Sequence, residues 1–458
     1  MKSARCLFLL ATACLGAQAP LQTSSPAANA TAERLRAEAF RTHGAYADLA
    51  WLCDHIGARL SGSPQLDQAI DWAQARLKAA GLTNVHAEPA MVPHWVRGHE
   101  SAELLSPAPQ RVNLLGLGGS VGTPEGGLTA DVVVVGSFDE LDKLGEAVKG
   151  KIVLFDVPFK GYGHTVVYRH DGASRAAKYG AAAALVRSVG PVSLDTPHTG
   201  AMDYDPAYPK IPTAAVTIEA STQMRRMQAR GERIRMKLEM GAKTLPDAPS
   251  ANVVAEIRGT EKPDEVVILS GHLDSWDVGQ GAQDDGAGTV TAMEAARLIQ
   301  TLGLKPRRTI RVVLWTNEEN GLRGGKAYRD AHRAELGQII AAFETDSGSE
   351  RIKAFSLDLS KATPETKAGA LTSLKKLGAV EPFGAIDLRL GGSGADVSPM
   401  VAEGVPGIGV GHAATHYFDI HHTQADTFDK VDQDDLAFNA AALASFAYAL
   451  AQSDVRFN

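Results

Sequence analysis

The chain has few cysteines, no excess of positive charge and no long apolar run after its first residues. Three of its 458 residues are cysteines. Cys6 and Cys14 lie near the N-terminus, so Cys53 has no expected intrachain partner and no disulfide is expected. The formal net charge of −7 offers no basic surface for nucleic acid or for an anionic membrane. No later run approaches the roughly 20 apolar residues of a spanning helix, so no integral membrane segment is expected.

The N-terminus has the pattern of an export signal. "MKSAR" is a short positive segment, residues 6–17 form an apolar run too short to cross a bilayer, and "AQA" at 17–19 is a small-residue cleavage pattern. We expect residues 1–19 to be a signal peptide, and the protein to be periplasmic or extracellular after cleavage. Cys14, preceded by Ala-Thr-Ala, leaves a lipoprotein signal as the minor alternative. Residues 20–33, rich in Pro, Ser, Ala and Thr, are expected to be a linker.

The remainder of the chain is too long for one typical domain. It shows two different patterns of strand-like and helical segments. From about residue 250, apolar strand-like runs alternate with helical stretches, which is typical of a mostly parallel sheet with helices on both faces. Residues 105–245 carry short strand-like runs between Gly- and Pro-rich stretches. We therefore expect a mixed α/β protein in which residues 34–104 and 246–458 form the main domain and residues 105–245 form an inserted β-rich domain.

One helix has both of its ends marked in the sequence. Within residues 61–82, Ser63 is suited to cap the first turn, Pro64 to take the first helical position and Gly81 to end the helix. We expect this helix to precede the first strand of the main domain.

Acidic and histidine side chains stand where the strand-like runs of the main domain end. His272 and Asp274 follow "EVVILSG" (265–271), and Glu318 and Glu319 follow "TIRVVLW" (309–315). In open α/β sheets, ligands bind at the carboxyl ends of the strands. Two adjacent carboxylates at such a place repel each other unless a positive partner is present.

Three further segments supply donors of the same kind. Asp284 and Asp285 lie in "GAQDDGAG", Asp346 lies in "ETDSG", and His421 and His422 lie in "DIHHTQADT". Each segment alone is more often an ordinary turn or a solvated polar stretch. Together they place two imidazoles among several carboxylates at the strand exits of one α/β unit. That set suits Zn²⁺, with one carboxylate bridging a pair of ions.

These segments also resemble a known family. In their order, "GHLDSWDVGQGAQDDGAG", "NEENG", "ETDSG" and "HHTQADT" resemble the co-catalytic zinc exopeptidases of the M28 type. The first of them and "GGSGADVSPM" (391–400) are most similar to the carboxypeptidase Q branch. The resemblance covers roughly residues 40–90 and 250–450. The middle region resembles the protease-associated insert of several members only in its pattern of short strand-like runs between Gly- and Pro-rich stretches.

The resemblance implies the zinc-exopeptidase fold and hydrolysis of dipeptides or short peptides with free termini. It implies two zinc ions per chain with five ligands: His272 and Asp346 for one ion, Glu319 and His422 for the other, and Asp284 bridging both. Glu318 would be the general base, and Asp274 would orient His272 through its second ring nitrogen. The Asp284–Asp285 bond stands where the family often has a cis peptide. A homodimer would fit the resemblance.

The segment "LGGSGADVSPM" (390–400) is a glycine-rich loop without the lysine of a phosphate-binding loop. We expect its backbone N–H groups, Ser393 or Asp396 to help bind a substrate terminus. An ordinary connecting loop is the alternative.

Three other functions fit parts of the pattern. Aminopeptidases of the same family have nearly the same ligands, so the ligands do not decide which end of a peptide is cut. A receptor-like ectodomain without activity would have lost ligands that this chain keeps. An acyltransferase related to glutaminyl cyclases would hold one metal ion instead of two. The expected partners are short peptides, with no nucleic acid.

Overall fold

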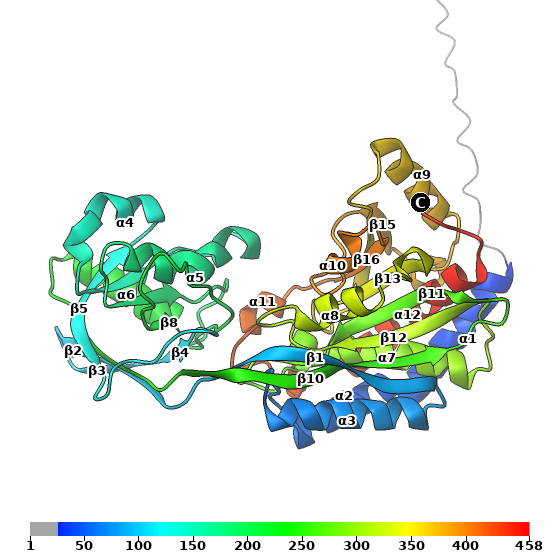
Figure 1. Ribbon diagram of the computed structural model, residues 1–458, viewed down its shortest axis with the longest axis horizontal. Helices are drawn as coiled ribbons and strands as arrows, with labels where there is room; N and C mark the ends of the chain where they lie inside the picture. The colour runs from blue at the N-terminus through cyan, green and yellow to red at the C-terminus, as the bar shows by residue number, and fades with distance from the viewer. Residues whose placement is uncertain (1–25, 458) are drawn as a thin grey trace, which may run out of the picture.

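The computed structural model describes residues 26–457. Two eight-stranded sheets organise these residues into two bodies that lie side by side (Figure 1). The predicted signal peptide (1–19), with Cys14, lies outside the described residues. Among the described residues, no helix has the length and apolar character needed to cross a membrane.

Residues 26–33, predicted to belong to a linker, are helical instead. Helix α1 spans Pro26–Thr42 and buries Ala32, Leu35 and Ala39. Proline is well tolerated at the start of a helix, and alanine has the highest helix propensity. The composition that indicated a linker therefore also suits a helix when an apolar surface is present to pack against.

The first sheet has the order β1-β10-β12-β11-β13-β16-β14-β15. Its four central strands are mutually parallel: β12 (Arg308–Trp315), β11 (Lys262–His272), β13 (Ile339–Thr345) and β16 (Gly407–His412). The outer strands, mostly antiparallel to their inner neighbours, are β1 (Thr83–Val96), β10 (Lys243–Ile257), β14 (Ile352–Asp358) and β15 (Asp387–Leu390). The predicted mixed, mostly parallel sheet is confirmed.

Helices cover both faces of this sheet. On one face the largest apolar core joins the sheet to α1 and to α2 (Gly44–His55), α3 (Pro64–Ala79), α7 (Ala287–Thr301), α9 (Pro364–Lys375) and α12 (Gln433–Gln452). On the other face α8 (Arg323–Ala331) and α10 (Ser398–Val401) pack around Trp315 of β12. The central strands β12 and β13 have no solvated side and are buried along nearly their whole length, whereas the edge strand β15 is largely exposed.

Helix α3 begins and ends as the sequence predicts. The Ser63 side-chain oxygen accepts the amide N–H of Leu66, and Pro64 is the first helical residue. Gly81 follows the helix with a φ of 80°, in the left-handed region that glycine adopts readily.

The sheet of the second body takes all of its strands from residues 100–240. This sheet has the order β3-β2-β9-β5-β6-β7-β8-β4. Four strands are parallel neighbours: β5 (Leu128–Val135), β6 (Ile152–Phe155), β7 (Ala183–Arg187) and β8 (Thr213–Val216). The others pair antiparallel: β2 (Glu100–Ser106), β3 (Gln110–Val112), β4 (Leu114–Gly116) and β9 (Arg235–Met240).

Helices also cover both faces of the second sheet, which makes this body more helical than the sequence indicated. Along β6, Ile152 and Leu154 enter the core beneath α6 (Ile218–Ala229). Val153 and Phe155 enter the opposite core, beneath α4 (Phe138–Leu144) and α5 (Tyr162–Ala177). The alternation follows the two-residue period of a strand.

The second body is inserted between β1 and β10, two strands that pair with each other in the first sheet. In Figure 1 it lies beside the first body, and the short helix α11 (Tyr417–Ile420) lies at the junction. There the Phe418 ring packs against Phe159 and Tyr162, with centroid separations of 6.0 and 5.2 Å. The two bodies therefore meet beside the "HHT" segment of the chain.

Candidate metal centre

The strand order opens a crevice at the end of β11. Strand β12 pairs with one side of β11, and the chain then crosses to place β13 on the other side. Such switch points are where open α/β sheets bind ligands. His272 is the last residue of β11, Glu318 and Glu319 follow β12, and Asp346 follows β13. The structure thus brings these residues to one edge of the sheet.

His272, Asp284 and Asp346 form the first cluster of donors. The Nε2 atom of His272 lies 3.2 Å from an oxygen of Asp284 and 3.6 Å from one of Asp346. Its Nδ1 atom faces the backbone oxygen of Asp274 at 3.0 Å. A hydrogen on Nδ1 leaves Nε2 with a lone pair directed at the cluster, as a metal-ligating imidazole requires.

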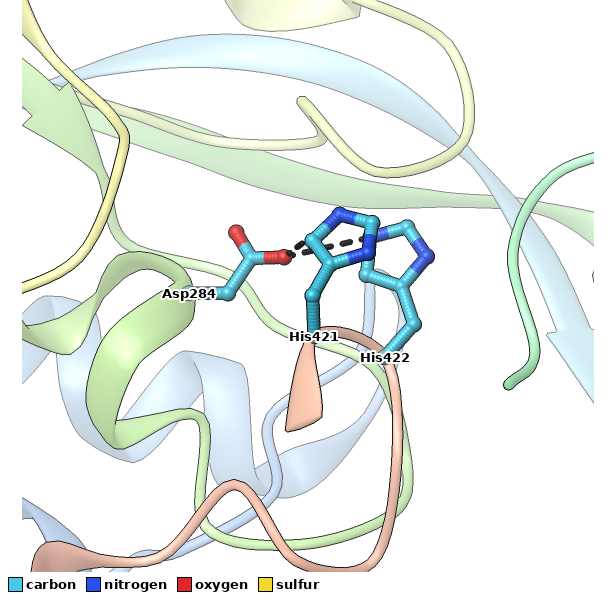
Figure 2. Close-up of side chains that lie close together, drawn as sticks. All are labelled: Asp284, His421 and His422. Carbon is cyan, nitrogen blue, oxygen red and sulfur yellow. Dashed lines mark ion pairs between the residues drawn. The ribbon is translucent and has the colours of Figure 1, made fainter. Parts of the chain in front are cut away.

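Asp284, His421 and His422 form the second cluster. Figure 2 shows both imidazoles facing the same oxygen of Asp284, at 3.1 Å from His422 and 3.4 Å from His421. The Nε2 atom of His422 also lies 3.1 Å from Glu319, and the two histidine rings stack at 3.6 Å. Asp284 belongs to both clusters, and it turns one oxygen to His272 and the other to the histidine pair.

Backbone hydrogen bonds hold Asp284 in this position. The Asp284–Asp285 peptide is cis, as the family resemblance implied. The Asp285 carboxylate accepts the N–H groups of His272 and Gly288, both at 3.0 Å. The Asp426 carboxylate accepts the N–H of Asp284 at 3.2 Å. Asp284 is therefore held from two sides, by Asp285 and by Asp426.

The backbone and the side chain of Asp274 make different contacts in the site. The carboxylate lies 3.7 Å from Nδ1 of His272, too far for a hydrogen bond, so only the backbone oxygen orients that ring. The carboxylate oxygens instead accept the N–H groups of Glu318 at 3.0 Å and Glu319 at 3.4 Å. Asp274 therefore fixes the glutamate pair as well as His272, a function that the sequence did not indicate.

The buried acidic groups of the site have too little positive charge near them to keep all of them ionised. Burial, together with the neighbouring Asp284, raises the pKa of Glu319 to about 7. Burial, with Asp346 and Glu319 nearby, raises the pKa of Glu318 well above its ordinary value. One oxygen of Glu319 is buried without a hydrogen-bond partner, and one of Asp284 faces only the two imidazoles. A cation removes both conditions, and imidazoles mixed with carboxylates are a donor set that zinc accepts. The residues present therefore fit zinc.

The second body reaches this site through His422. The N–H of Thr199 donates to the backbone oxygen of His422 at 2.9 Å, and the Thr199 backbone oxygen lies 3.2 Å from Nδ1 of His422. With the ring hydrogen directed at Thr199, Nε2 is left to face Asp284 and Glu319. Arg169 of α5 donates to the same Thr199 oxygen at 3.2 Å. These contacts could not be predicted from the sequence, because nothing in the stretches around Thr199 or Arg169 has a metal-site pattern.

A cavity of about 720 Å³ lies over the donors. The first body contributes, among others, Glu318, Glu319 and Asp346 to its wall, and the second body contributes Tyr162 and Arg169. Both bodies thus enclose the space in which a substrate would meet the metal ligands.

The predicted substrate-binding residues of the glycine-rich loop lie away from this cavity. Asp396 is fully buried, and Ser393, which is 4% exposed, donates to Asp358 at 3.2 Å. Neither residue lines the cavity wall. These positions do not favour the predicted contact with a substrate terminus.

Three N–H groups of the same loop are already bonded to one carboxylate. The Glu344 carboxylate accepts those of Ala395, Asp396 and Val397 at 2.8, 3.2 and 2.8 Å. At Gly394, which has a φ of 132°, a Cβ atom would stand 2.3 Å from the Glu344 carboxyl carbon. The glycine therefore permits the close approach of this loop to Glu344, and the N–H groups of Ala395, Asp396 and Val397 are not free to bind a substrate.

Comparison with known proteins agrees with this geometry. The model of "Peptidase family M28" matches residues 252–447. Carboxypeptidase Q of Bos taurus is 45% identical over 89% of this chain and 85% of that protein. The chain belongs to peptidase family M28. It is a metallo-exopeptidase, a hydrolase of peptide bonds. Carboxypeptidase Q of Homo sapiens is 43% identical, with coverage of 89% and 85%, so the predicted family resemblance is confirmed.

Solved structures confirm the predicted fold. A peptidase M28 precursor from Shewanella amazonensis has a TM-score of 0.89 and 37% identity, and the match covers 94% of this chain and 98% of that chain. An aminopeptidase from Aneurinibacillus sp. has a TM-score of 0.65 and 22% identity, with coverage of 92% and 95%. The second likeness, at its low identity, concerns the fold alone.

Proposed function

We propose that this enzyme is a carboxypeptidase or dipeptidase that hydrolyses dipeptides and short peptides with free termini, using two zinc ions. The position of Asp284 carries the proposal, because its two oxygens face two separate donor clusters. The choice of the carboxyl end is supported by the relatives named carboxypeptidase Q, which match most of this chain.

Five residues would hold the ions, and each has its donor atom turned into the site: His272 and Asp346 for one ion, Glu319 and His422 for the other, and Asp284 for both. His422 is preferred to His421 because His422 lies 3.1 Å from both Asp284 and Glu319. His421 lies 3.4 Å from Asp284. When bound, zinc supplies the positive charge that activates a water molecule and polarises the carbonyl of the peptide.

Glu318 would act as the general base. It lines the cavity, belongs to neither donor cluster, and has its backbone N–H held by Asp274. It takes a proton from the attacking water and returns it to the amine that leaves. It needs its ionised form for the first step, and positive charge beside it favours that form.

Hydrolysis of unblocked dipeptides by the purified protein tests this function, with zinc content measured in parallel. We expect Glu318→Gln to keep two zinc ions per chain and to lose about 10²- to 10⁴-fold in kcat, the usual contribution of a general base. Glu365→Gln, at an exposed position of α9, is the control and should leave both quantities unchanged. Full activity of Glu318→Gln would exclude it as the base.

Release of N-terminal residues is the second candidate, because structural neighbours from Aneurinibacillus sp. and Bacillus subtilis are aminopeptidases. Aminoacyl anilides and longer peptides, assayed beside the dipeptides, separate the two activities. The complete donor set argues against a receptor-like ectodomain, because such a protein would have lost some of these ligands. A zinc content near one ion per chain would favour a glutaminyl-cyclase-like acyltransferase.

Three further predictions belong to the same proposal. Residues 1–19 would be removed on export, which N-terminal sequencing of the mature protein checks. The chain would form a homodimer, which light scattering checks. The second body would be an inserted domain of the protease-associated kind, with limits near the predicted 105 and 245. Limited proteolysis between the bodies checks that division.

A further inference from the structure

Arg169 is a buried cation without a carboxylate partner. Its side chain stands on α5 in the second body and is 6% exposed, yet it lines the cavity over the metal ligands. Among the described residues, no aspartate or glutamate forms an ion pair with it. Buried charges in folded proteins are normally paired, because an isolated charge loses the solvation that water would provide.

The hydrogen bonds of Arg169 leave part of its guanidinium unused. It donates to the Tyr162 hydroxyl at 2.8 Å and to the Thr199 backbone oxygen at 3.2 Å, and both acceptors are neutral. Its Nε atom has no partner. Another buried arginine, Arg59, differs because it donates to a set of backbone oxygens: those of Gly57, Leu273, Gln280 and Gly281.

Arg169 is also the one Lys or Arg side chain in the wall of this cavity, as far as the described residues go. The carboxylate side chains of the wall supply its negative charge, and the buried ones are accounted for in the proposed function as metal ligands or as the general base. A guanidinium binds a carboxylate through paired, charge-assisted hydrogen bonds. The Tyr162 hydroxyl, which accepts from Arg169, retains its own O–H for donation.

The position of Arg169 suits one particular carboxylate. Its Nη1 atom lies 3.4 Å from Nδ1 of His422, on the opposite side of the ring from the Nε2 atom that faces Asp284 and Glu319. The guanidinium is therefore one imidazole ring away from the metal ligands. In a dipeptide, the terminal carboxylate lies within about one residue length, ~3.8 Å between Cα atoms, of the bond that is cut.

We propose that Arg169, together with the Tyr162 hydroxyl, binds the free α-carboxylate of the substrate. This inference rests on the proposed function and deepens it: the second body, through α5, makes the enzyme select the carboxyl end. A substrate carboxylate supplies the negative partner that the protein itself does not provide for this buried cation.

The test compares a dipeptide with its C-terminal amide, which differs only in the terminal charge. We expect the wild type to prefer the acid in kcat/KM by about 10- to 100-fold, the range of one or two charge-assisted hydrogen bonds. Arg169→Met should bring the acid-to-amide ratio close to one, chiefly by raising KM for the acid. The amide, which has no terminal carboxylate to lose, should lose much less activity than the acid.

Arg175→Met is the matched control, because Arg175 stands on the same helix and pairs with Asp142 away from the cavity. It should keep the wild-type ratio. Tyr162→Phe removes a single hydroxyl and should lower the ratio by a few-fold. This milder variant keeps the test decisive if Arg169→Met does not fold.

Two results would overturn the proposal while leaving peptide hydrolysis intact. One is a wild type that hydrolyses acid and amide equally well. The other is an equal loss for acid and amide in Arg169→Met, which would mean that Arg169 acts only through Thr199 and His422. A wild type that cleaves neither dipeptide but releases N-terminal residues from longer peptides would overturn the proposed function and this inference together.

Discussion

The Asp274 carboxylate accepts the backbone N–H of Glu318 at 3.0 Å. This bond joins the end of β11 to the turn after β12, and so ties the proposed base to the strand that carries His272. The second carboxylate oxygen accepts the N–H of Glu319 at 3.4 Å. One side chain therefore sets the positions of the proposed base and of a proposed metal ligand.

Replacement of Asp274 by asparagine should lower activity more than metal binding. Asparagine has one acceptor oxygen where the carboxylate has two, so one of the two glutamate N–H groups would face an NH₂ group. We expect kcat to fall about 10- to 100-fold, as for other partners of metal ligands, with the zinc content retained. Asp264→Asn, at an exposed position of the same strand, is the control. Loss of both ions would show that Asp274 supports the ligands more than the base.

His422 and His421 should differ in zinc binding although they are adjacent. His422→Ala removes the imidazole that lies 3.1 Å from both Asp284 and Glu319, so we expect the content to fall from two zinc ions to one. His421→Ala should keep two ions. Zinc measured by atomic absorption after dialysis checks both variants. The reverse pattern would make His421 the ligand.

The metal-free protein should lose stability as the pH rises. Burial is the main cause that raises the pKa of Glu319, Glu344 and Asp426 to about 7. Between their ordinary values, near 4, and pH 7, the folded state holds more protons than the unfolded state, so stability falls through this window. We expect a loss of roughly 1–3 kcal/mol per group.

His272 and His422 act in the same direction, whereas His421 opposes them, because burial and the adjacent His422 lower its pKa well below 6.5. Burial opposes protonation of His272 and His422, but their carboxylate neighbours raise the pKa of each well above 6.5. Their stabilising contribution is complete below pH 6.5 and is lost as the pH rises through the folded-state value. Calorimetry of chelator-treated protein from pH 5 to 8 measures the combined effect. Zinc should stabilise more at higher pH, because it competes with protons for the ligands. A metal-free Tm that rises over this range would contradict the prediction.

Gly200→Ala, a substitution in the second body, should weaken the binding of zinc to the metal centre of the first body. A Cβ atom there would stand 2.3 Å from the Arg169 guanidinium carbon, at a φ of 141°. The clash displaces Thr199, whose backbone oxygen orients His422. We expect an affinity loss of about 10- to 100-fold, measured by competition with a chromogenic chelator. Gly231→Ala, at a φ of 76° with nothing near its Cβ position, controls for backbone strain alone. Equal zinc affinity in the two variants would exclude the contact between the bodies.

The sequence by itself was enough to nominate residues that the structure brings together at the candidate metal centre. Apolar runs with β-branched residues specify buried parallel strands, and the carboxyl ends of parallel strands share one edge of the sheet. That rule alone places His272, Glu318, Glu319 and Asp346 together. The ends of α3 were predictable for an equally local reason, since Ser63 caps its first turn.

Only the tertiary structure decided what surrounds those residues. Thr199 and His422 are separated by 223 positions, and no periodic pattern links residues so far apart. The burial of Asp396 was equally hidden, because a glycine-rich loop looks the same in sequence whether it faces a substrate or packs on Glu344. Local patterns specify which backbone conformation each segment prefers. The packing of the second body against the first specifies which side chains share one buried environment, and so places Arg169 beside the metal ligands.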